Sequence, residues 1–329
     1  MNAMRAAIVE APGQAPQLGE RARADAGEGE LLVGVRAAPI TPLDLLCASG
    51  TSYFGRPQTP YVPGVQGVGV VERGTAAIPA GTLVWFATSA GMKPGDGSMR
   101  ATAAVPESDV VALPRDADPV LVAALGLSAV AAWMALTWRG ELEPGEQVLV
   151  LGAGGVVGQA GVQLARIAGA ERVVAAARSA EARERAVRLG ADAVVELTAD
   201  DTVEGLADRM RAATGGTVDL VLDPLFGVPA AAAMRTLRPH GRLVNLGSSA
   251  GETAPIDSST LRSRSLRMLG YTNNELTPAE RREALTRVVE EAVAGRLTVA
   301  HEQVPLDDAA QAWTRQAAGQ AACRIVLTP

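Results

Sequence analysis

The chain has 329 residues, enough for about two domains, and its 48% hydrophobic and 20% charged residues are typical of a folded globular protein. A net charge of −6 disfavours non-specific binding to nucleic acid or to an anionic membrane surface. The two cysteines, Cys47 and Cys323, lie far apart in the sequence, form no disulfide framework and favour a reducing cytoplasm.

The first part of the chain, up to about residue 119, is predicted to form short strands separated by turns. Apolar or β-branched runs are interrupted by proline and glycine, and strands are expected at residues 6–9, 30–35, 67–71 and 81–87. Residues 94–98 (Pro-Gly-Asp-Gly-Ser) are rich in turn formers, and the loop around them is long enough to lie over a site.

One uncharged segment, residues 119–138, has about the length that a membrane-spanning helix needs. It is rich in alanine, contains Gly126, Ser128 and Thr137, and lacks isoleucine and phenylalanine. This content favours a buried helix in a soluble core over a membrane span.

From residue 139 onward, short apolar strands alternate with segments of helical periodicity. Strands are expected at residues 147–151, 172–177, 193–195, 218–223, 242–247 and 266–271. Helices are expected between them, at residues 157–168, 180–189, 202–213 and 229–237. Such alternation predicts an α/β fold with a doubly wound parallel sheet and right-handed crossovers. Two further helices, at 278–294 and 307–318, and two strands, at 299–304 and 324–327, complete the chain.

A glycine-rich segment follows the strand expected at 147–151 and opens the next helix. A dinucleotide pyrophosphate needs a backbone without nearby side chains, inward-facing N–H groups and the positive end of a helix. The spacing is G-x-x-G-x-x-G, because Val157 stands where G-x-G-x-x-G would need its third glycine. A tight turn with close helix–strand packing is the alternative, but the strand before and the helix after favour dinucleotide binding. The residues expected around the pyrophosphate are Gly152, Gly154, Gly155, Val156, Val157 and Gly158.

The end of the second strand of this sheet indicates which dinucleotide to expect. An NAD-preferring fold carries an Asp or Glu there to hold the ribose hydroxyls, whereas this chain has Arg178 and Ser179. A carboxylate would repel a 2′-phosphate, while a guanidinium offers it a planar fork of donors and a hydroxyl offers one more. Arg178 could instead be a solvated charge at a strand end, but the pair favours NADPH.

Several longer segments resemble one protein family. They are residues 27–38, Thr41-Pro-Leu-Asp44, 60–64, 67–71, 190–192, 218–223, 237–244 and 324–327. In order and spacing they resemble the medium-chain dehydrogenase/reductases over essentially the whole chain, and most closely the zinc-free quinone oxidoreductases. The resemblance implies a GroES-like β-domain, residues 1–122 with 296–329, and a Rossmann domain, residues 123–295, with the site between them.

The resemblance also implies roles for single residues. Asn245 and Gly247 follow the fifth strand, where the nicotinamide half of the coenzyme is expected, although local turn bonding would equally explain Asn245. Ser128 matches a hydroxyl that relatives place near the nicotinamide, with a plain helix hydroxyl as the alternative. Tyr53 and Phe54 match the aromatic position of the substrate cleft, with simple packing as the alternative.

Two positions depart from the family pattern. Thr41 stands where relatives often have Asn, and Ala182 replaces a lysine that commonly reaches the 2′-phosphate, with Arg183 one step along. Arg178 therefore carries most of the argument for NADPH. Thr41 and Tyr53 are the candidate hydrogen-bond donors to a substrate.

Metal ligands are scarce in this chain. Catalytic zinc needs three protein ligands and structural zinc commonly takes four cysteines, whereas the chain has two cysteines and two histidines, His240 and His301, none close to another in sequence. Thr41 and Gln66, with Val65 before it, stand where zinc-dependent relatives carry ligands. No metal is expected.

Together these features predict an NADPH-dependent oxidoreductase that transfers a hydride to a quinone or another α,β-unsaturated carbonyl. Without zinc, nothing polarises an alcohol oxygen strongly, whereas an enolate needs only hydrogen-bond donors. Two alternatives stay open: a tailoring reductase of one natural-product intermediate, and a non-catalytic module that binds NADPH as a structural or interaction partner. The resemblance implies a homodimer paired through the strand at 266–271, and we expect a small-molecule substrate with no nucleic-acid or membrane partner.

Overall fold

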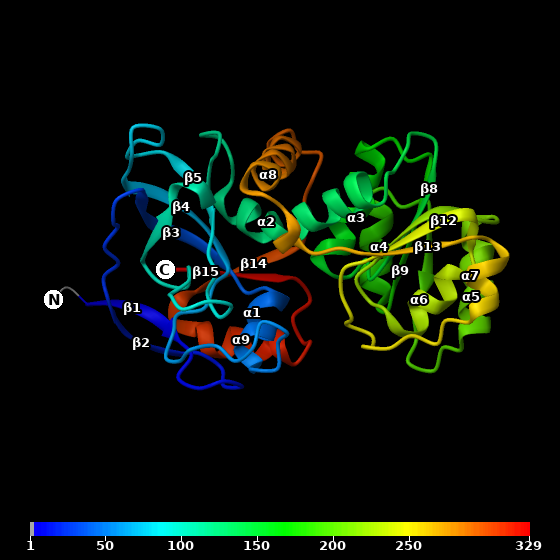
Figure 1. Ribbon diagram of the computed structural model, residues 1–329, viewed down its shortest axis with the longest axis horizontal. Coiled ribbons are helices and arrows are strands. Elements are labelled where there is room, and N and C mark those ends of the chain that lie inside the picture. The colour runs from blue at the N-terminus through cyan, green and yellow to red at the C-terminus, as the bar shows by residue number, and fades with distance from the viewer. Residues whose placement is uncertain (1–2) are drawn as a thin grey trace. The chain divides into compact units, whose positions relative to one another are not determined.

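The computed structural model describes residues 3–329, which form two compact units (Figure 1). The first unit holds the described residues up to Gly126 together with Leu285–Gly295 and Val299–Pro329, and the second holds Leu127–Ala284 and Arg296–Thr298. The sequence assigned residues 285–295 to the Rossmann domain, but this segment, mostly the second half of helix α8 (Pro278–Val293), packs with the first unit. The functional domain limits at residues 122 and 296 stay a prediction.

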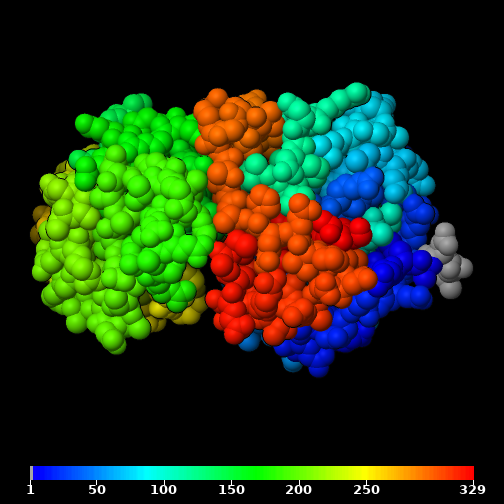
Figure 2. Space-filling model, turned by 180° about the vertical axis from the view of Figure 1, so that it is seen from behind, coloured from blue at the N-terminus to red at the C-terminus, as the bar shows by residue number. Residues whose placement is uncertain are grey.

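The first unit is built on a seven-stranded sheet of order β14-β15-β3-β4-β5-β7, with β6 paired to β3 off this path. Its strands are β3 (Glu30–Pro39), β4 (Gln66–Arg73), β5 (Leu83–Ala87), β6 (Thr102–Pro106), β7 (Val110–Ala112), β14 (His301–Pro305) and β15 (Arg324–Thr328). A separate hairpin pairs β1 (Ala3–Ile8) with β2 (Gln17–Ala22). Because β15 pairs antiparallel with β3, late and early segments share this unit, and Figure 2 shows red segments packed beside blue ones.

Strand β3 shows how the core of this unit forms. Leu31, Val33 and Val35 are buried and alternate with more exposed residues, as expected for a strand with one face on a core. They join Phe86 of β5 and Trp313 of helix α9 (Ala309–Ala317) in one hydrophobic cluster. Several elements of this unit were not expected from the sequence, among them β2, β6, β7 and helix α1 (Pro42–Ser49).

The second unit contains the doubly wound parallel sheet that the alternation of strands and helices predicts. Its strands are all parallel, in the order β10-β9-β8-β11-β12-β13. They are β8 (Gln147–Leu151), β9 (Arg172–Ala177), β10 (Ala193–Glu196), β11 (Val218–Asp223), β12 (Leu237–Asn245) and β13 (Arg267–Gly270). The connecting helices are α3 (Val156–Ile167), α4 (Ala180–Arg188), α5 (Val203–Thr214), α6 (Gly227–Met234) and α7 (Ser258–Ser263). The strand order reverses between β8 and β11, which places the ligand crevice at the carboxyl ends of these strands.

Helices cover both faces of this sheet (Figure 1). Leu149 and Leu151 of β8 share a hydrophobic cluster with residues of α5 and α6. Val150, between them in sequence, faces the other way toward α3, where a Cβ added to Gly161 would lie 3.5 Å from Val150 Cγ1 and 2.4 Å from Leu222 Cδ2. Glycine at position 161 therefore lets α3 pack this closely on the sheet.

Helix α2 (Pro119–Met134) is interrupted at Gly126, whose φ of 32° and ψ of −133° are not helical. A Cβ at this position would lie 2.1 Å from Oε1 of Gln66, a buried side chain whose Oε1 accepts a hydrogen bond of 3.1 Å from Trp85 Nε1. By length and composition the segment Pro119–Arg139 could cross a membrane, and 61% of its most apolar window is buried inside the structure. A core helix of a soluble protein meets the same criteria, so the segment is only weak evidence for a membrane span.

Candidate functional site: the carboxyl edge of the parallel sheet

The glycine-rich turn lies at the carboxyl end of β8, beside the reversal of strand order. Helix α3 begins at Val156, and Gln159 donates a helical hydrogen bond of 2.9 Å to the Gly155 carbonyl. The N–H groups of Val156, Val157 and Gly158 lie ahead of this bond, at the open end of the helix. A helix N-terminus of this kind can bind a phosphate group.

Packing within the protein accounts for only part of the glycine pattern. Gly152 has a φ of +67°, and a Cβ on Gly158 would lie 2.3 Å from the Gly152 carbonyl oxygen, so the fold requires both glycines. A Cβ on Gly154 or Gly155 would come no closer than 3.3 Å and 3.7 Å to other atoms. The tight-turn alternative therefore explains Gly152 and Gly158 and in part Gly154, whereas a Cβ on Gly155 would make only an ordinary van der Waals contact. Close approach of a ligand to the backbone would explain a glycine at position 155.

The three residues expected to bind the 2′-phosphate lie at and after the end of β9, and their side-chain contacts differ. Arg178 is exposed, and its guanidinium makes no hydrogen bond or ion pair within residues 3–329. Ser179 caps α4, where its hydroxyl accepts a hydrogen bond of 3.2 Å from the Ala182 N–H. Arg183 turns back to the strand ends, donating to the Arg178 carbonyl at 2.5 Å and pairing with Glu196 at 3.1 Å. Of these three residues, Arg178 is therefore the one whose side chain has no partner in the described structure.

Asn245 and Gly247 lie where expected, at the carboxyl end of β12. The Asn245 amide donates to Oδ2 of Asp223 (2.9 Å) and to the Gly247 carbonyl (2.8 Å), so its NH2 group is already hydrogen-bonded within the protein. Asp223, at the end of β11, was not singled out from the sequence although it is fully buried. The sequence signal that could have identified it is a carboxylate at the end of an apolar strand. Burial raises the pKa of Asp223, as expected for a carboxylate in such a position.

In the first unit, Thr41 is buried and caps helix α1. Its hydroxyl accepts from the Asp44 N–H at 3.2 Å and its backbone N–H donates to Oδ2 of Asp44 at 2.8 Å, which together form a capping box. The hydroxyl also donates to Oδ2 of Asp44 at 2.6 Å. The hydroxyl proton expected to reach a substrate is therefore used within the fold. Thr41 as a substrate donor stays a prediction that requires this hydroxyl to leave Asp44.

Asp44 is a buried carboxylate that the sequence showed only as part of a family motif. Its Oδ1 accepts from the N–H groups of Gly64 (3.1 Å) and Val65 (2.9 Å), which ties the loop before β4 to helix α1. Burial raises the pKa of Asp44 despite these bonds, and burial lowers the pKa of nearby Arg324 to about 10. Asp44 thus organises the loop next to Thr41.

The aromatic pair is open to solvent. Tyr53 is 76% exposed, and its ring packs on Phe54 with 4.2 Å between centroids. Ser128 is half-buried two residues after the break in α2 and belongs to the second unit. Tyr61 contrasts with Tyr53, because it is buried and its hydroxyl has no hydrogen-bond partner among the residues described.

The donor set does not fit a zinc site. Within residues 3–329, no three His, Cys, Asp or Glu side chains come together in a way that could hold a metal ion. Gln66, at one of the family's ligand positions, bonds Trp85 and donates to the Ala123 carbonyl at 3.4 Å. Burial raises the pKa of the Cys47 thiol to about 12, which disfavours the thiolate that zinc binds. Independence from zinc stays a prediction.

Comparison with protein families identifies both parts of the chain. Residues 27–115 match the alcohol dehydrogenase GroES-like domain, and residues 156–290 match the zinc-binding dehydrogenase domain. The chain is 29% identical to the quinone oxidoreductase of Lama guanicoe over 238 residues, which is 71% of this chain and 69% of that protein. A mycobacterial quinone oxidoreductase has a similar structure, with a TM-score of 0.86, 26% identity, and 99% of this chain and 100% of that chain covered.

These matches define a two-domain dehydrogenase/reductase. The chain belongs to the medium-chain dehydrogenase/reductase superfamily, in its quinone oxidoreductase-like branch, which confirms the resemblance and the fold class inferred from the sequence.

Other relatives are longer than this chain. It is 33% identical, over 215 residues, to a phenolphthiocerol/phthiocerol polyketide synthase of Mycobacterium tuberculosis, a match that covers 63% of this chain and 9% of that protein. It is 31% identical, over 232 residues, to the human synaptic vesicle membrane protein VAT-1 homolog, covering 70% of this chain and 56% of that protein. The chain thus spans less than two thirds of the length of these relatives.

Proposed function

We propose that the protein is an NADPH-dependent oxidoreductase that transfers a hydride to a quinone or another α,β-unsaturated carbonyl without zinc. The observation that carries this proposal is the carboxyl edge of the parallel sheet, where an open glycine turn and helix start lie beside the unpaired guanidinium of Arg178. The relatives named quinone oxidoreductase support it, as does a similar mycobacterial structure in complex with NADPH, with a TM-score of 0.86, 25% identity, and 99% of this chain and 100% of that chain covered.

The residues present fit this coenzyme. The N–H groups of Val156, Val157 and Gly158 would hold the pyrophosphate, and the lack of side chains at Gly154 and Gly155 would let it approach the backbone. Arg178 would pair with the 2′-phosphate, as no carboxylate stands at the end of β9 to repel it. Ser179 and Arg183 would shape the turn around Arg178 rather than bind phosphate first, because both already have partners in it.

A conjugated carbonyl fits the groups available for chemistry. When bound, NADPH supplies a hydride, which forms a C–H bond at the electron-poor carbon of the substrate while the C=C electron pair moves toward the carbonyl oxygen. The resulting enolate needs hydrogen-bond donors and then a proton from solvent. The Tyr53 hydroxyl is exposed and makes no hydrogen bond within residues 3–329, so it is a better donor candidate than Thr41, which donates to Asp44.

A natural-product reductase is a second candidate function. The observation that favours it is the 33% identity to a polyketide synthase. Since the match covers only 9% of that protein, an activity on a polyketide intermediate would belong to the shared segment alone. Such an enzyme would reduce the same conjugated group but would select one larger substrate.

One experiment tests the main proposal against the non-catalytic alternative. Purified protein treated with a chelator is mixed with NADPH and, separately, a simple quinone, an enone, and an aldehyde. We expect NADPH oxidation with the quinone or the enone, and little with the aldehyde. Turnover of the aldehyde without the conjugated substrates would contradict the proposed reaction. Binding of NADPH with no turnover of any acceptor would favour the non-catalytic module.

We also propose that the protein acts as a cytoplasmic homodimer on a small-molecule substrate, without nucleic-acid or membrane partners. Strand β13 lies at the edge of the parallel sheet with Met268 48% exposed, which leaves it available for pairing with a second copy. Arg267 in this strand is paired with Glu141 at 2.8 Å, which reduces charge repulsion between two such edges. Light scattering at micromolar concentration is expected to give about twice the chain mass of 33.8 kDa, and a mass of one chain would contradict the dimer.

A further inference from the structure

The carboxylate of Asp223 is fully buried at the end of β11 and uses both of its oxygens. Oδ1 accepts hydrogen bonds from the N–H groups of Leu225 (2.9 Å) and Phe226 (2.8 Å). Oδ2 accepts from the amide of Asn245 at 2.9 Å, and Asn245 is its register partner on β12. Across the described chain this carboxylate forms no ion pair, so neutral donors alone hold it in place.

These bonds hold a strained loop. Phe226 has a φ of 58° and a ψ of −155°, a backbone region that favours glycine, and its N–H is one of the two bound to Oδ1. The loop is also bound to the segment after β12, since the Ala250 N–H donates to the Leu225 carbonyl at 2.8 Å. A Cβ on Gly247 would lie 2.8 Å from the Pro224 carbonyl oxygen, so the two strand ends are in close contact.

The same loop contacts the glycine turn. A Cβ on Gly152 would lie 2.9 Å from Leu225 Cδ2 and 3.3 Å from Pro224 Cγ. Strands β8 and β11 are the neighbours at which the strand order reverses. In this fold the adenosine half of a dinucleotide lies over the strands on one side of the reversal, here β8 to β10, and the nicotinamide half lies over β11 to β13. The loop held by Asp223 is therefore on the nicotinamide side.

We propose that Asp223 is a positioning residue for the nicotinamide half of the coenzyme, acting through the loop 223–227 and through Asn245. This inference rests on the proposed NADPH-dependent function and adds a residue to it. The adenosine half is held by the glycine turn and Arg178, which do not touch this carboxylate. Loss of the carboxylate should therefore weaken the whole coenzyme and spare its adenosine fragment.

The test compares two Asp→Asn substitutions at opposite ends of strand β11. Asp223→Asn keeps an acceptor for the loop N–H groups but sets its NH2 group against that of Asn245. Asp219→Asn, the matched control, lies at the amino end of the strand, where Asp219 accepts from the Gln147 N–H at 2.7 Å and pairs with Arg238. Each variant is titrated with NADPH and with adenosine 2′,5′-bisphosphate, a probe that carries the adenosine half and the 2′-phosphate only.

We expect Asp223→Asn to weaken NADPH binding about 10-fold and to leave bisphosphate binding unchanged within about 2-fold. Asp219→Asn should leave both affinities unchanged while lowering the melting temperature. If Asp223→Asn does not fold, Asn245→Ala removes the bond to Oδ2 together with the bonds of this amide to the Asp223 and Gly247 carbonyls, and keeps both loop N–H bonds to Oδ1. A selective loss of about 3-fold for NADPH is then expected.

Two results would overturn the inference. Equal weakening of NADPH and bisphosphate would mean that Asp223 supports the whole unit rather than the nicotinamide half, and unchanged NADPH affinity would mean that it positions nothing. Failure of the wild-type protein to bind either probe would be a different outcome, because it would remove the proposed function itself and this inference with it.

Discussion

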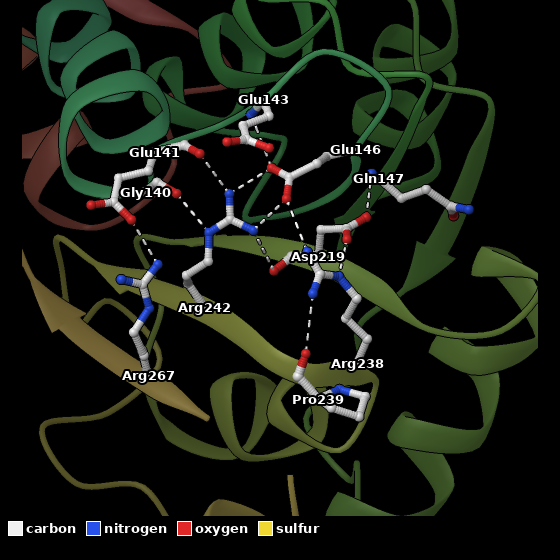
Figure 3. A network of polar contacts seen from close by, with 10 residues as sticks. All are labelled: Gly140, Glu141, Glu143, Glu146, Gln147, Asp219, Arg238, Pro239, Arg242 and Arg267. Carbon is white, nitrogen blue, oxygen red and sulfur yellow. Dashed lines mark hydrogen bonds and ion pairs between the residues drawn. The ribbon is translucent and has the colours of Figure 1, made fainter. Parts of the chain in front are cut away.

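The two edges of the parallel sheet are built from different chemistry. At the amino edge, Arg242 is buried and its guanidinium pairs with Glu146 at 2.5 Å while Nε donates to the Gly140 carbonyl at 2.7 Å (Figure 3). Arg238 links Glu146 to Asp219 in the same network (Figure 3). At the carboxyl edge, apart from the Arg183–Glu196 ion pair, the turns carry glycines and neutral donors, and the Arg178 guanidinium has no partner within residues 3–329.

This difference separates stability from binding along the same strands. A buried ion pair costs desolvation, and it is tolerated where its partners are complete and no ligand has to enter. An edge that binds a phosphate must instead leave N–H groups and a cation unpaired until the ligand arrives. Strand β11 shows both solutions, because Asp219 pairs with arginine at one end and Asp223 with amide groups at the other.

The largest expected effect is at the amino edge. Glu146→Gln should lower the free energy of unfolding by about 3 kcal/mol, because it leaves Arg242 buried without its carboxylate. Urea denaturation measures this loss, and NADPH affinity of the folded variant should stay unchanged. Glu141→Gln is the control, since its partner Arg267 is exposed and little stability should be lost. Similar losses of stability in the two variants would contradict the expected difference between the buried and the exposed ion pair.

Lowering the pH should remove the stabilisation that the Glu146 carboxylate provides. Burial alone would raise the pKa of Glu146, but the hydrogen bonds and charge of Arg242 hold it below the ordinary value of 4.5. A carboxyl whose pKa is lowered in the folded state stabilises the fold above its unfolded pKa and ceases to do so as the pH falls through its folded pKa. The stability difference between wild type and Glu146→Gln should therefore shrink below about pH 4.5. A difference that is the same at about pH 3 as at about pH 7 would contradict this assignment.

At the carboxyl edge, Arg178→Ala should affect binding and not stability. We expect NADPH affinity to fall about 10- to 100-fold while NADH affinity stays unchanged, because one charge-assisted contact to the 2′-phosphate is lost. Arg188→Ala removes the same charge from the last turn of α4 and serves as the control. Fluorescence titration of both coenzymes measures the effect. Equal affinity of the wild type for NADPH and NADH would contradict the assignment of NADPH as the preferred coenzyme.

Substitutions at two glycines of the turn should likewise separate an effect on stability from an effect on coenzyme binding. Gly158→Ala places a Cβ 2.3 Å from a backbone oxygen and should cost about 1–3 kcal/mol of stability. Gly155→Ala meets nothing closer than 3.7 Å, so the fold should tolerate it while NADPH binding weakens about 5-fold. Thermal unfolding and coenzyme titration of the two variants check this. Unchanged binding in Gly155→Ala would mean that the space there is not used by the ligand.

The smallest effect extends the comparison to the first unit, where Tyr53 is exposed and Tyr61 is buried. Tyr53→Phe should lower turnover with a quinone about 10-fold, because it removes a donor to the developing oxyanion but no obligatory acid. Tyr61→Phe is the matched control and should leave turnover unchanged while stabilising the fold by up to about 1 kcal/mol, since its hydroxyl is unpaired in the described structure. A loss of more than about 100-fold in Tyr53→Phe would make Tyr53 an essential proton donor.

Local patterns were enough to predict the parallel sheet and its glycine turn. The bounds of β8, β9 and β11 agree with the sequence prediction because apolar residues dominate each segment and turn residues flank it. Strand β2 has no such pattern, since most of Gln17–Ala22 is polar or exposed, and only its pairing with β1 makes it a strand. Helix α1 was missed because its eight residues are too few to show helical periodicity.

The sequence by itself determined which residues stand at the carboxyl edge: the glycines after β8, Arg178 after β9, and Asn245 at the end of β12. Only the tertiary structure decided how each of them is used. Arg183 is engaged by Glu196, and the Asn245 amide by Asp223, which lies 22 residues away on the neighbouring strand. The reason is that a side chain's partners depend on which strands lie side by side, and strand order is a property of the folded sheet rather than of any local segment.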